Sequence, residues 1–366
     1  MFDLFEGKKI LVTGGTGSIG SEIVRNLMRY NPSEVRVFSR GESEIFDMQH
    51  SFSLFENITY LVGDVRDKSR LAKSIKGVDY VFHTAALKHV PTCELNPYEA
   101  VKTNVIGTEN LIDLAVEEGV GRVISISTDK ACSPTNVMGA TKLLAERIIA
   151  AANCAHGNTN TVFASVRFGN VMASRGSVIP LFVKQIQQGG PVTLTSREMT
   201  RFMMTIPQAI NLIFEATRIA RGGEIFILKM PALCLVDLAE VMIEEIAPSF
   251  GFEPEDIALS LIGPRPGEKM YEQLLTYEES KLVAEYDNMF VLTSRLQNSA
   301  KANERFSSNA ISYSSNQIPL LTKNEIRALL RTIHVIPDNV QGIKREFIAD
   351  SPRSRVKHIL QHQKHV

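Results

Sequence analysis

The sequence has few cysteines, and they are not arranged to hold a metal or to form a disulfide framework. The four cysteines stand apart, with no CxxC pair among them: Cys93, Cys132, Cys154 and Cys234. Zinc sites and disulfide-stapled folds need closely or regularly spaced cysteines. We therefore predict reduced, mostly buried thiols, a cytoplasmic location and no metal site.

The chain also lacks an excess of either charge and any long apolar run. Its 40 basic and 40 acidic side chains cancel, which argues against a nucleic-acid partner because phosphate binding needs a basic excess. No stretch of about 18 apolar residues is present, so we expect no membrane span. Residues 1–12 lack the pattern of a signal peptide. With 44% hydrophobic residues, the chain is not expected to be disordered.

A length of 366 residues predicts two domains, or one large domain with an inserted lobe. In the first half, short apolar runs alternate with helical patterns. We expect strands at 9–12, 34–39, 58–62, 78–83 and 122–127, and helices at 21–29, 97–118 and 139–152. Strands separated by crossover helices form a parallel sheet covered on both faces. The predicted class is therefore α/β, a Rossmann-type doubly wound sheet with a smaller C-terminal substrate-binding lobe.

The alternation loosens after about residue 165, where we expect a helix at 207–220, a strand at 224–228 and a helix at 236–246. The domain boundaries that we predict are 1–166 plus about 206–228 for the Rossmann domain, 167–205 plus about 229–295 for the lobe, and 296–366 for a connector and extension. Residues 296–318 are rich in Ser and Asn and predict a loop. The basic stretch 344–366 predicts a solvated helix or subunit contact, with membrane lipid or nucleic acid as the alternative.

A glycine-rich turn follows the first expected strand and precedes the first helix. Gly14, Gly17 and Gly20 form a GxxGxxG pattern, with Thr16, Ser18 and Ile19 between them. Such glycines permit a tight turn, close approach of the backbone to a pyrophosphate, and close packing of helix on strand. The helix N-terminus then offers N–H groups to the phosphates. The pattern predicts a bound dinucleotide.

The end of the second strand bears on which dinucleotide binds. An acidic residue there would accept hydrogen bonds from the ribose of NAD, but this chain has Ser39 and Arg40. A guanidinium and a hydroxyl suit the 2′-phosphate of NADP, so we favour NADP over NAD. Further cofactor contacts are expected where the third and fourth strands end: Asp64 and Val65 near the adenine, and Ala85, Ala86 and Lys88 along the middle of the cofactor.

The fifth strand leads into Thr128, Asp129 and Lys130, and Met138 and Lys142 follow on the next helix. Here the chain resembles the extended short-chain dehydrogenase/reductase family, which carries Tyr-x-x-x-Lys on that helix. In the family the Tyr is the acid/base and the Lys binds the nicotinamide ribose. Lys142 matches, but Met138 stands in place of the Tyr, and a thioether exchanges no proton. Either the protein is inactive, or the proton leaves by Thr128, Lys142 or a water.

The string STDKACSPTNVMGATK resembles the UDP-N-acetylglucosamine 4,6-dehydratases of polysaccharide biosynthesis, some active members of which carry this Met. The resemblance runs from Gly7 to Leu292 and includes the motifs ALKHVP, RFGNVMASRGSVIP, MTRFMM and RPGEK. It implies oxidation of the sugar at carbon 4, loss of water across carbons 5 and 6, and return of the hydride to carbon 6. It makes Asp129 the acid at carbon 6 and Lys130 the base at carbon 5. We expect burial or Lys142 to lower the pKa of Lys130.

The resemblance also implies how the lobe holds a UDP-sugar. Candidate cations for the phosphates are Lys88, Arg201 and Arg265. The further implied contacts are Asn170 with the diphosphate or sugar, Arg175, Ser177 and Val178 in the nucleotide pocket, and Glu268 with the ribose. Asn104 matches an Asn near the nicotinamide, and its alternative role is to cap a helix.

We therefore expect an NADP-dependent UDP-N-acetylglucosamine 4,6-dehydratase. The segment 224–231 resembles inverting members and the SIGSE string at 18–22 resembles retaining members; we favour inversion at carbon 5. The alternatives are a 4-epimerase of UDP-N-acetylhexosamine, which needs no acid and base at carbons 5 and 6, and a non-catalytic NADP-sensing protein, which Met138 would allow. The family forms dimers through two helices, matched here by 97–118 and 139–152, and some members form hexamers. A homo-oligomer is expected.

Overall fold

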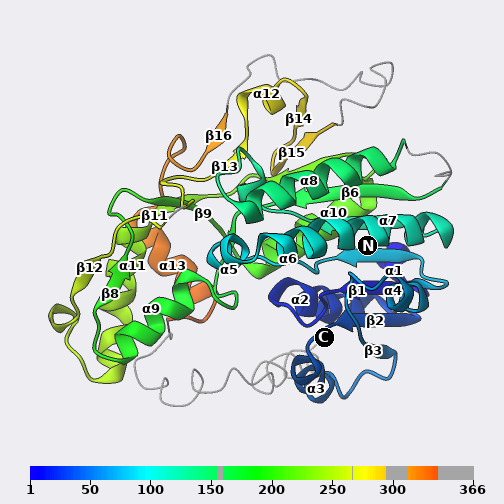
Figure 1. The fold of residues 1–366 in the computed structure, drawn as a ribbon. Helices are drawn as coiled ribbons and strands as arrows, with labels where there is room; N and C mark the ends of the chain where they lie inside the picture. Colours follow the sequence, from blue (N-terminus) through cyan, green and yellow to red (C-terminus); the bar gives the residue numbers. More distant parts are fainter. Residues whose placement is uncertain (155–159, 266, 294–311, 337–366) are drawn as a thin grey trace.

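The computed structural model describes residues 1–154, 160–265, 267–293 and 312–336, and a nine-stranded sheet forms its centre (Figure 1). The strand order is β14-β15-β10-β6-β5-β4-β1-β2-β3, parallel from β3 to β10, with β15 and β14 antiparallel at the edge. The strands are β1 (Lys9–Thr13), β2 (Glu34–Ser39), β3 (Ile58–Val62), β4 (Tyr80–His83), β5 (Arg122–Ile126), β6 (Val162–Arg167), β10 (Ile225–Leu228), β14 (Val283–Glu285) and β15 (Met289–Leu292). The predicted doubly wound α/β class is confirmed.

The strand order reverses between β1 and β4, and this reversal positions the site. In a doubly wound sheet, ligands bind where the order reverses, beyond the carboxyl ends of the strands. The loops that leave β1, β4 and β5 all reach this edge. They carry the glycine turn, residues 84–88 and residues 127–131, so the fold gathers three of the predicted site segments.

Helices cover both faces of the sheet. Ile23 of α2 and Phe214 of α10 share one core with Phe82, whereas Leu111 of α7 and Ile149 of α8 belong to a second core on the other face. The helical elements of this domain are α1 (Phe2–Phe5), α2 (Ser18–Leu27), η1 (Met28–Tyr30), α3 (Glu42–Ser51), α4 (Lys68–Ile75), α5 (Val90–Leu95), α6 (Pro97–Val101), η2 (Lys102–Ile106), α7 (Gly107–Glu117), η3 (Asp129–Ala131), α8 (Val137–Ala152) and α10 (Ile206–Ile219).

The prediction of a single helix over residues 97–118 is wrong in detail. The segment consists of α6, a π-helical turn at η2 and then α7. A π-turn carries one extra residue, and such turns are frequent at functional sites. Here it buries the polar side chains of Thr103 and Asn104. The helix expected at 21–29 begins three residues earlier, at Ser18, directly after the glycine turn.

The smaller lobe has its own core, to which Phe182, Met242 and Leu330 contribute. Its elements are β7 (Asn170–Val171), α9 (Val178–Gln187), β8 (Val192–Leu194), β9 (Thr200–Met204), β11 (Ala232–Cys234), α11 (Leu235–Ile246), η4 (Ala247–Phe250), η5 (Pro254–Asp256), β12 (Leu259–Leu261) and α13 (Lys323–Thr332). Between the lobe and the sheet edge lie β13 (Gln273–Leu275), α12 (Tyr277–Ser280) and β16 (Tyr313–Ser314). The lobe is thus built from segments that are separated in the sequence.

Two details differ from the sequence interpretation. β14 and β15, within the range assigned to the lobe, instead extend the main sheet, because β15 pairs antiparallel with β10 and supplies the backbone partners that β10 needs. β16 lies in the stretch 296–318 predicted as a loop and pairs with β13. Residues 296–311 and the basic stretch 344–366 lie outside the described residues, and the domain boundaries stay predictions.

Three expected absences can be compared with the described part of the chain. No helix there is long and apolar enough to cross a membrane. None of the four cysteines, all of which are described, forms a disulfide, and Cys93 and Cys132 are buried. Within the same residues no group of three or more His, Cys, Asp or Glu side chains is arranged to hold a metal ion.

Candidate functional site

The glycine turn is held so tightly that its first and last glycines have no room for a side chain. Gly14 has a φ of 67°, and a Cβ there would lie 2.7 Å from the backbone nitrogen of Ala85. A Cβ on Gly20 would collide with the carbonyl oxygen of Gly14. Gly17 is the N-cap of α2 and provides no side chain to cap it. The first N–H groups of α2, from Ser18 onward, are therefore left for an anion.

The predicted adenine end of the cofactor site lies where β2 and β3 end. The Thr16 and Ser39 hydroxyls are 2.7 Å apart, and Arg40 lies 3.6 Å from Asp64. Burial raises the pKa of Asp64, but hydrogen bonds from Arg66 outweigh it and hold that pKa below its usual value. Arg40 is half-exposed. Its guanidinium thus stands beside a charged carboxylate and still faces solvent.

Val65 is placed differently from the other adenine candidates. Its side chain is buried in the core beneath α4 and α7, and its carbonyl oxygen accepts a hydrogen bond of 3.0 Å from Asn110. Only the backbone of Val65 is therefore placed to meet a ligand.

Lys88 and Arg175 meet at the glycine turn. Lys88 Nζ donates to the carbonyl oxygen of Arg175 at 2.9 Å, the backbone N–H of Arg175 donates to Ser18 Oγ at 3.1 Å, and the guanidinium of Arg175 donates to the carbonyl oxygen of Thr16. Burial, followed by the charge of Arg175, lowers the pKa of Lys88. Arg175, expected in the pocket for the sugar nucleotide, thus lies against the turn expected to hold the cofactor phosphates.

The Asn104 side chain makes three hydrogen bonds within the protein, and its expected position near the nicotinamide stays a prediction. Its side-chain N–H groups donate to the carbonyl oxygen of Leu87 and to Thr141 Oγ1, both at 3.0 Å, and its carbonyl oxygen accepts from the Leu87 N–H at 2.8 Å. It does not cap a helix. The amide instead braces the loop after Ala85 and Ala86 against α8, which the π-turn at η2 makes possible.

Helix α8 begins where the family's tyrosine would stand. Asn136 caps the helix by accepting a hydrogen bond from the Gly139 N–H at 2.8 Å. Met138 is 3% exposed and packs with Cys93 and Ala100. One turn later, Lys142 Nζ donates to the carbonyl oxygen of Ile126 at 2.7 Å. Met138 fills space beside the site and exchanges no proton.

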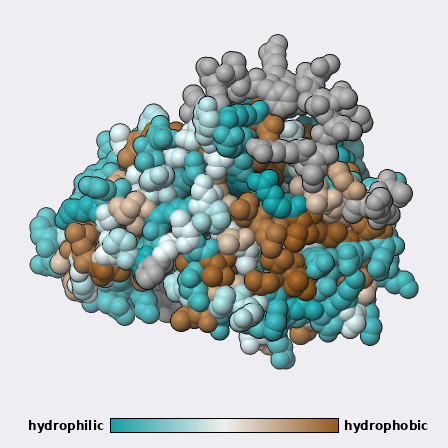
Figure 2. Space-filling view, turned by 45° about the horizontal axis from the view of Figure 1, so that its top comes forward, coloured by the Kyte–Doolittle hydropathy of each residue, from teal (hydrophilic) through white to brown (hydrophobic). Residues whose placement is uncertain are grey.

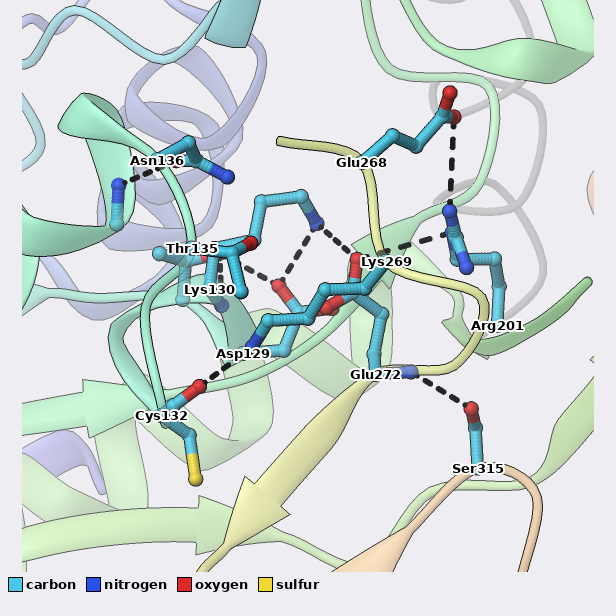
Figure 3. Close-up of polar contacts among 12 residues, drawn as sticks. Asp129, Lys130, Cys132, Thr135, Asn136, Arg201, Glu268, Lys269, Glu272 and Ser315 are labelled. Carbon is cyan, nitrogen blue, oxygen red and sulfur yellow. Dashed lines mark hydrogen bonds and ion pairs between the residues drawn. The ribbon is translucent and has the colours of Figure 1, made fainter. Parts of the chain in front are cut away.

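A cluster of four charged side chains, the acid–lysine cluster, follows β5 (Figure 3). Its members are Asp129, Lys130, Glu272 and Arg201. Lys130 Nζ lies 3.1 Å from Asp129 Oδ1 and 3.0 Å from Glu272 Oε1, and Arg201 Nε lies 3.8 Å from Glu272 Oε1. The Asp129 and Glu272 side chains are only 1% and 2% exposed. Thr128 Oγ1 donates to Asp129 Oδ1 at 2.7 Å.

The expectation of a lowered pKa for Lys130 is wrong. Burial lowers that pKa, but the facing carboxylates of Asp129 and Glu272 outweigh burial and raise it. Burial, followed by the charge of Asp129, raises the pKa of Glu272. Lys142, which was expected to act on Lys130, instead has its own pKa lowered to about 8 by burial. The resting cluster therefore holds Lys130 as an ammonium.

Glu272 was missed in the sequence. It follows the RPGEK motif by three residues, and nothing in that spacing connects it with the Asp129–Lys130 pair. The fold makes the connection, because the segment after the motif crosses over the end of β5 and enters β13. The Glu272 backbone N–H donates to Ser315 Oγ at 3.0 Å, which fixes this crossing.

The substrate candidates in the lobe are divided between the cluster and the surface. Arg201 is buried and lies 3.7 Å from Glu268 Oε1. Its charge is therefore shared between the carboxylates of Glu268 and Glu272. Arg265 is exposed, and its backbone N–H donates to Glu268 Oε2 at 3.1 Å. Asn170, on β7, has a buried side-chain oxygen without a hydrogen-bond partner in the described ranges. Its oxygen is therefore available to a ligand.

Ser177 and Val178 stand at the start of α9. Ser177 is the N-cap residue, yet its hydroxyl makes no capping hydrogen bond and is buried without a partner among the residues described. Val178 is the first residue of the helix. An uncapped helix start with an unused hydroxyl suits the anionic part of a substrate.

The residues at the reversal of the strand order fit a nicotinamide dinucleotide. The glycine turn has no room for side chains, the N-terminus of α2 is uncapped, and Lys142 projects to the end of β5. The acid–lysine cluster lies in the loop that follows β5. In this cluster, one carboxylate oxygen of Asp129 and one of Glu272 have no hydrogen-bond partner among the described residues. Such a site combines a dinucleotide cradle with groups that move protons.

Three relatives cover nearly the whole chain. An uncharacterized membrane protein of Methanocaldococcus jannaschii is 52% identical over 90% of this chain and 97% of its own length. A UDP-N-acetylglucosamine 4,6-dehydratase (inverting) of Campylobacter jejuni is 39% identical, with 87% of this chain and 95% of that protein covered. A UDP-glucose 4-epimerase of Rickettsia canadensis is 37% identical, and the match covers 93% of this chain and 100% of that protein.

Solved structures agree with this family relationship. Pen from Bacillus thuringiensis has a TM-score of 0.85 and 47% identity, and the match covers 91% of this chain and 99% of that one. DesIV, a dTDP-glucose 4,6-dehydratase from Streptomyces venezuelae with NAD bound, has a TM-score of 0.63 and 25% identity. The match covers 72% of this chain and 86% of that one. Residues 10–294 match the profile of the polysaccharide biosynthesis proteins. With its Rossmann sheet and the geometry of its site, the chain belongs to the polysaccharide biosynthesis protein family.

Proposed function

We propose that this protein is an NADP-dependent 4,6-dehydratase of UDP-N-acetylglucosamine that inverts carbon 5. The product would be a UDP-4-keto-6-deoxy-N-acetylhexosamine. The observation that carries the proposal is the acid–lysine cluster: Lys130 Nζ lies 3.1 Å from the buried carboxylate of Asp129, and both residues follow the strand whose end Lys142 reaches. The name of the C. jejuni relative supports both the substrate and the inversion.

A bound nicotinamide would accept the hydride of carbon 4 and return it to carbon 6. The chain's own groups would do the rest. The glycine turn and α2 would hold the pyrophosphate, and Lys142 would bind the nicotinamide ribose. Ser39 and Arg40 would hold the 2′-phosphate of NADP, because a guanidinium binds a phosphate through two parallel hydrogen bonds.

Water loss would be divided between the two adjacent residues. Once carbon 4 is a ketone, the hydrogen at carbon 5 is acidic. Lys130 would remove it as a free amine, and Asp129 would protonate the departing 6-hydroxyl. Met138 adds no proton-transfer group, so Thr128, Lys142 or a water must take the proton of the 4-hydroxyl. Lys142, with its pKa near 8, is the group we favour.

A 4-epimerase is the second candidate, because several relatives carry the name UDP-glucose 4-epimerase at 37–42% identity. An epimerase shares the oxidation at carbon 4 but has no need of an acid and a base at carbons 5 and 6. The buried carboxylates around Lys130 therefore favour dehydration.

The product distinguishes the two activities. The purified protein is incubated with UDP-N-acetylglucosamine, and the mixture is followed by NMR. Dehydration produces a new methyl signal and a 4-keto carbon, whereas epimerisation produces a galacto sugar and no methyl signal. A protein that binds NADP but converts no substrate would support the alternative of a non-catalytic sensor.

We also propose that the protein forms a dimer. Figure 2 shows a large apolar area on one face of the molecule. The exposed apolar side chains of α5, α6, η2 and α8 are Leu95, Tyr98, Val101, Ile106 and Leu144. Apolar patches of this kind mark association surfaces. All of these side chains except Leu95 lie on the segments 97–118 and 139–152, which the family resemblance implies for subunit contact.

A further inference from the structure

Arg175 reaches from the small lobe to the glycine turn of the Rossmann domain. It lies in the loop between β7 and α9 of the lobe. Its guanidinium nevertheless donates to the carbonyl oxygen of Thr16, and its backbone N–H donates to Ser18 Oγ at 3.1 Å. Ser18 is the first residue of α2, whose uncapped N-terminus is the expected place of the cofactor pyrophosphate. The Arg175 side chain therefore lies beside that place.

The loop that carries Arg175 is held against the Rossmann domain by further contacts. Lys88, which follows β4, donates from Nζ to the carbonyl oxygen of Arg175 at 2.9 Å. Gly176 has a φ of 72°, and a Cβ there would lie 2.6 Å from Cε1 of His89. The close approach of the loop to residues 88 and 89 thus depends on a glycine, and it fixes where the Arg175 side chain begins.

The charges at this junction are all of one sign. Within the part of the chain that the structure describes, neither Lys88 nor Arg175 forms an ion pair with a carboxylate, and both donate to backbone carbonyl oxygens. Burial, followed by the charge of Arg175, lowers the pKa of Lys88, and burial followed by the charge of Lys88 lowers the pKa of His89. Basic groups that repel one another without an acidic partner are stabilised by a bound anion.

We propose that Arg175 is a cofactor clasp, whose guanidinium binds the pyrophosphate of NADP from the side of the small lobe. The inference rests on the proposed use of a nicotinamide dinucleotide, and it gives Arg175 a role that differs from the family-implied place in the sugar-nucleotide pocket. Of the guanidinium nitrogens, Nη2 is the one that donates to a group in the described residues. Nε and Nη1 are therefore left to donate to phosphate oxygens, which a guanidinium binds through two parallel hydrogen bonds.

The phosphates of the sugar nucleotide have a separate place close by. Ser177, two residues after Arg175, is the N-cap of α9, and its buried hydroxyl has no partner among the residues described. The start of α9 therefore offers free N–H groups and a hydroxyl on the lobe itself. The guanidinium of Arg175, by contrast, is bonded to Thr16 in the glycine turn. The loop thus divides the two sets of phosphates, with Arg175 on the side of the cofactor.

A clasp of this kind suits the proposed reaction. The hydride taken from carbon 4 returns to carbon 6, so the cofactor is regenerated in each turnover and has no need to leave. A pyrophosphate bound by both the glycine turn and Arg175 is held by two parts of the fold, and both contacts must break before the dinucleotide is released. Because changes in affinity appear mostly in the dissociation rate, Arg175 should slow the release of NADP.

The test is equilibrium binding of three probes to the wild type and to Arg175→Gln, measured by calorimetric titration. NADP contains the pyrophosphate, adenosine 2′-monophosphate contains the adenine and 2′-phosphate without it, and UDP represents the substrate. The Kd for NADP should rise about 10- to 100-fold, because charge-assisted hydrogen bonds are lost. The Kd values for the other two probes should change by less than about twofold. Stopped-flow displacement should show NADP leaving faster by the same factor as the rise in its Kd.

Two further variants serve as references. Arg175→Lys keeps the charge but not the planar fork, and it should lose less affinity for NADP than Arg175→Gln. Arg29→Gln changes an exposed arginine in η1, which follows the far end of α2, and should bind all three probes as the wild type does. An unchanged Kd for NADP in Arg175→Gln would overturn the proposal. So would a loss of affinity for UDP or adenosine 2′-monophosphate as large as that for NADP.

The binding test needs no turnover, so it separates this role from the proposed activity. A wild type that binds NADP but forms no product from UDP-N-acetylglucosamine would overturn the dehydratase function, and the effect of Arg175→Gln on NADP would still decide the role of Arg175. A wild type that binds neither NADP nor NAD would overturn both proposals.

Discussion

Lys142 Nζ donates a hydrogen bond of 2.7 Å to the carbonyl oxygen of Ile126 and thereby ties α8 to the end of β5. Burial lowers the pKa of this lysine to about 8 from an ordinary 10.5. The residue is thus poised between its charged and neutral forms near physiological pH, which suits a group that passes protons.

The lowered pKa has a consequence for stability. Between about pH 8 and 10.5 the unfolded chain holds a proton on Lys142 that the folded chain has lost, so stability rises with pH. The wild-type free energy of unfolding should therefore rise relative to that of Lys142→Met, by at most about 3 kcal/mol across this window. Urea unfolding of both proteins at several pH values measures the difference. A difference that stays constant with pH would contradict the lowered pKa.

Lys130→Ala should separate oxidation from water loss. The variant lacks the proposed base at carbon 5, so exchange of that hydrogen should fall by about 100-fold or more, while oxidation at carbon 4 continues in part. NMR of the sugar in deuterated water reports exchange, and absorbance of the reduced nicotinamide reports oxidation. Exchange that persists at the wild-type rate would show that another group is the base.

Arg167 connects the helix that carries Lys142 to the C-terminal segment. It is fully buried and pairs with Glu146 of α8 at 2.6 Å and Glu279 of α12 at 3.0 Å. Arg167→Leu leaves two buried carboxylates unpaired and should lower the free energy of unfolding by about 3–5 kcal/mol. Arg218→Leu, which breaks an exposed pair with Glu215, should cost at most about 1 kcal/mol. Equal losses in chemical denaturation would refute this account.

Arg40→Asp should shift the cofactor preference from NADP to NAD. The carboxylate would repel a 2′-phosphate and accept hydrogen bonds from a ribose. We expect the Kd for NADP to rise about 10- to 100-fold and that for NAD to fall. Calorimetric titration with both cofactors measures this, and Lys68→Ala, whose side chain pairs with Asp113, is the control. If the variant binds NADP with unchanged affinity, Arg40 does not contact the cofactor.

Leu144→Glu should disrupt the proposed dimer. Leu144 is 48% exposed on α8, and a charge there would be buried unpaired in the subunit contact. Sedimentation analysis should show a dimer for the wild type and a monomer for the variant. Leu261→Glu, on a leucine of the small lobe that is 56% exposed, should remain a dimer. If the Leu144→Glu variant still sediments with the mass of a dimer, the subunit contact does not involve this surface.

Much of the cofactor half could be predicted because its signals are local. The GxxGxxG turn can be recognised between a strand and a helix from its spacing alone. The structure adds that Gly20 lies too close to the backbone of Gly14, and Gly14 too close to that of Ala85, for any side chain. The parallel sheet likewise follows from the alternation of short apolar runs and helices. The π-turn at η2 could not be predicted from the sequence, because it depends on the hydrogen bonds between Asn104 and Leu87, which lie in different segments of the chain.

The sequence by itself determined the doubly wound fold, the glycine turn and the adjacency of Asp129 and Lys130. Only the tertiary structure decided the protonation of that pair. A side-chain pKa depends on the charges within a few ångströms, and the nearest ones on Lys130 include Glu272, which joins from a distant segment. Burial alone would have lowered the pKa of Lys130. The charge of Asp129, together with that of Glu272, which is placed by the crossing of residues 267–275 over β5, reversed the direction.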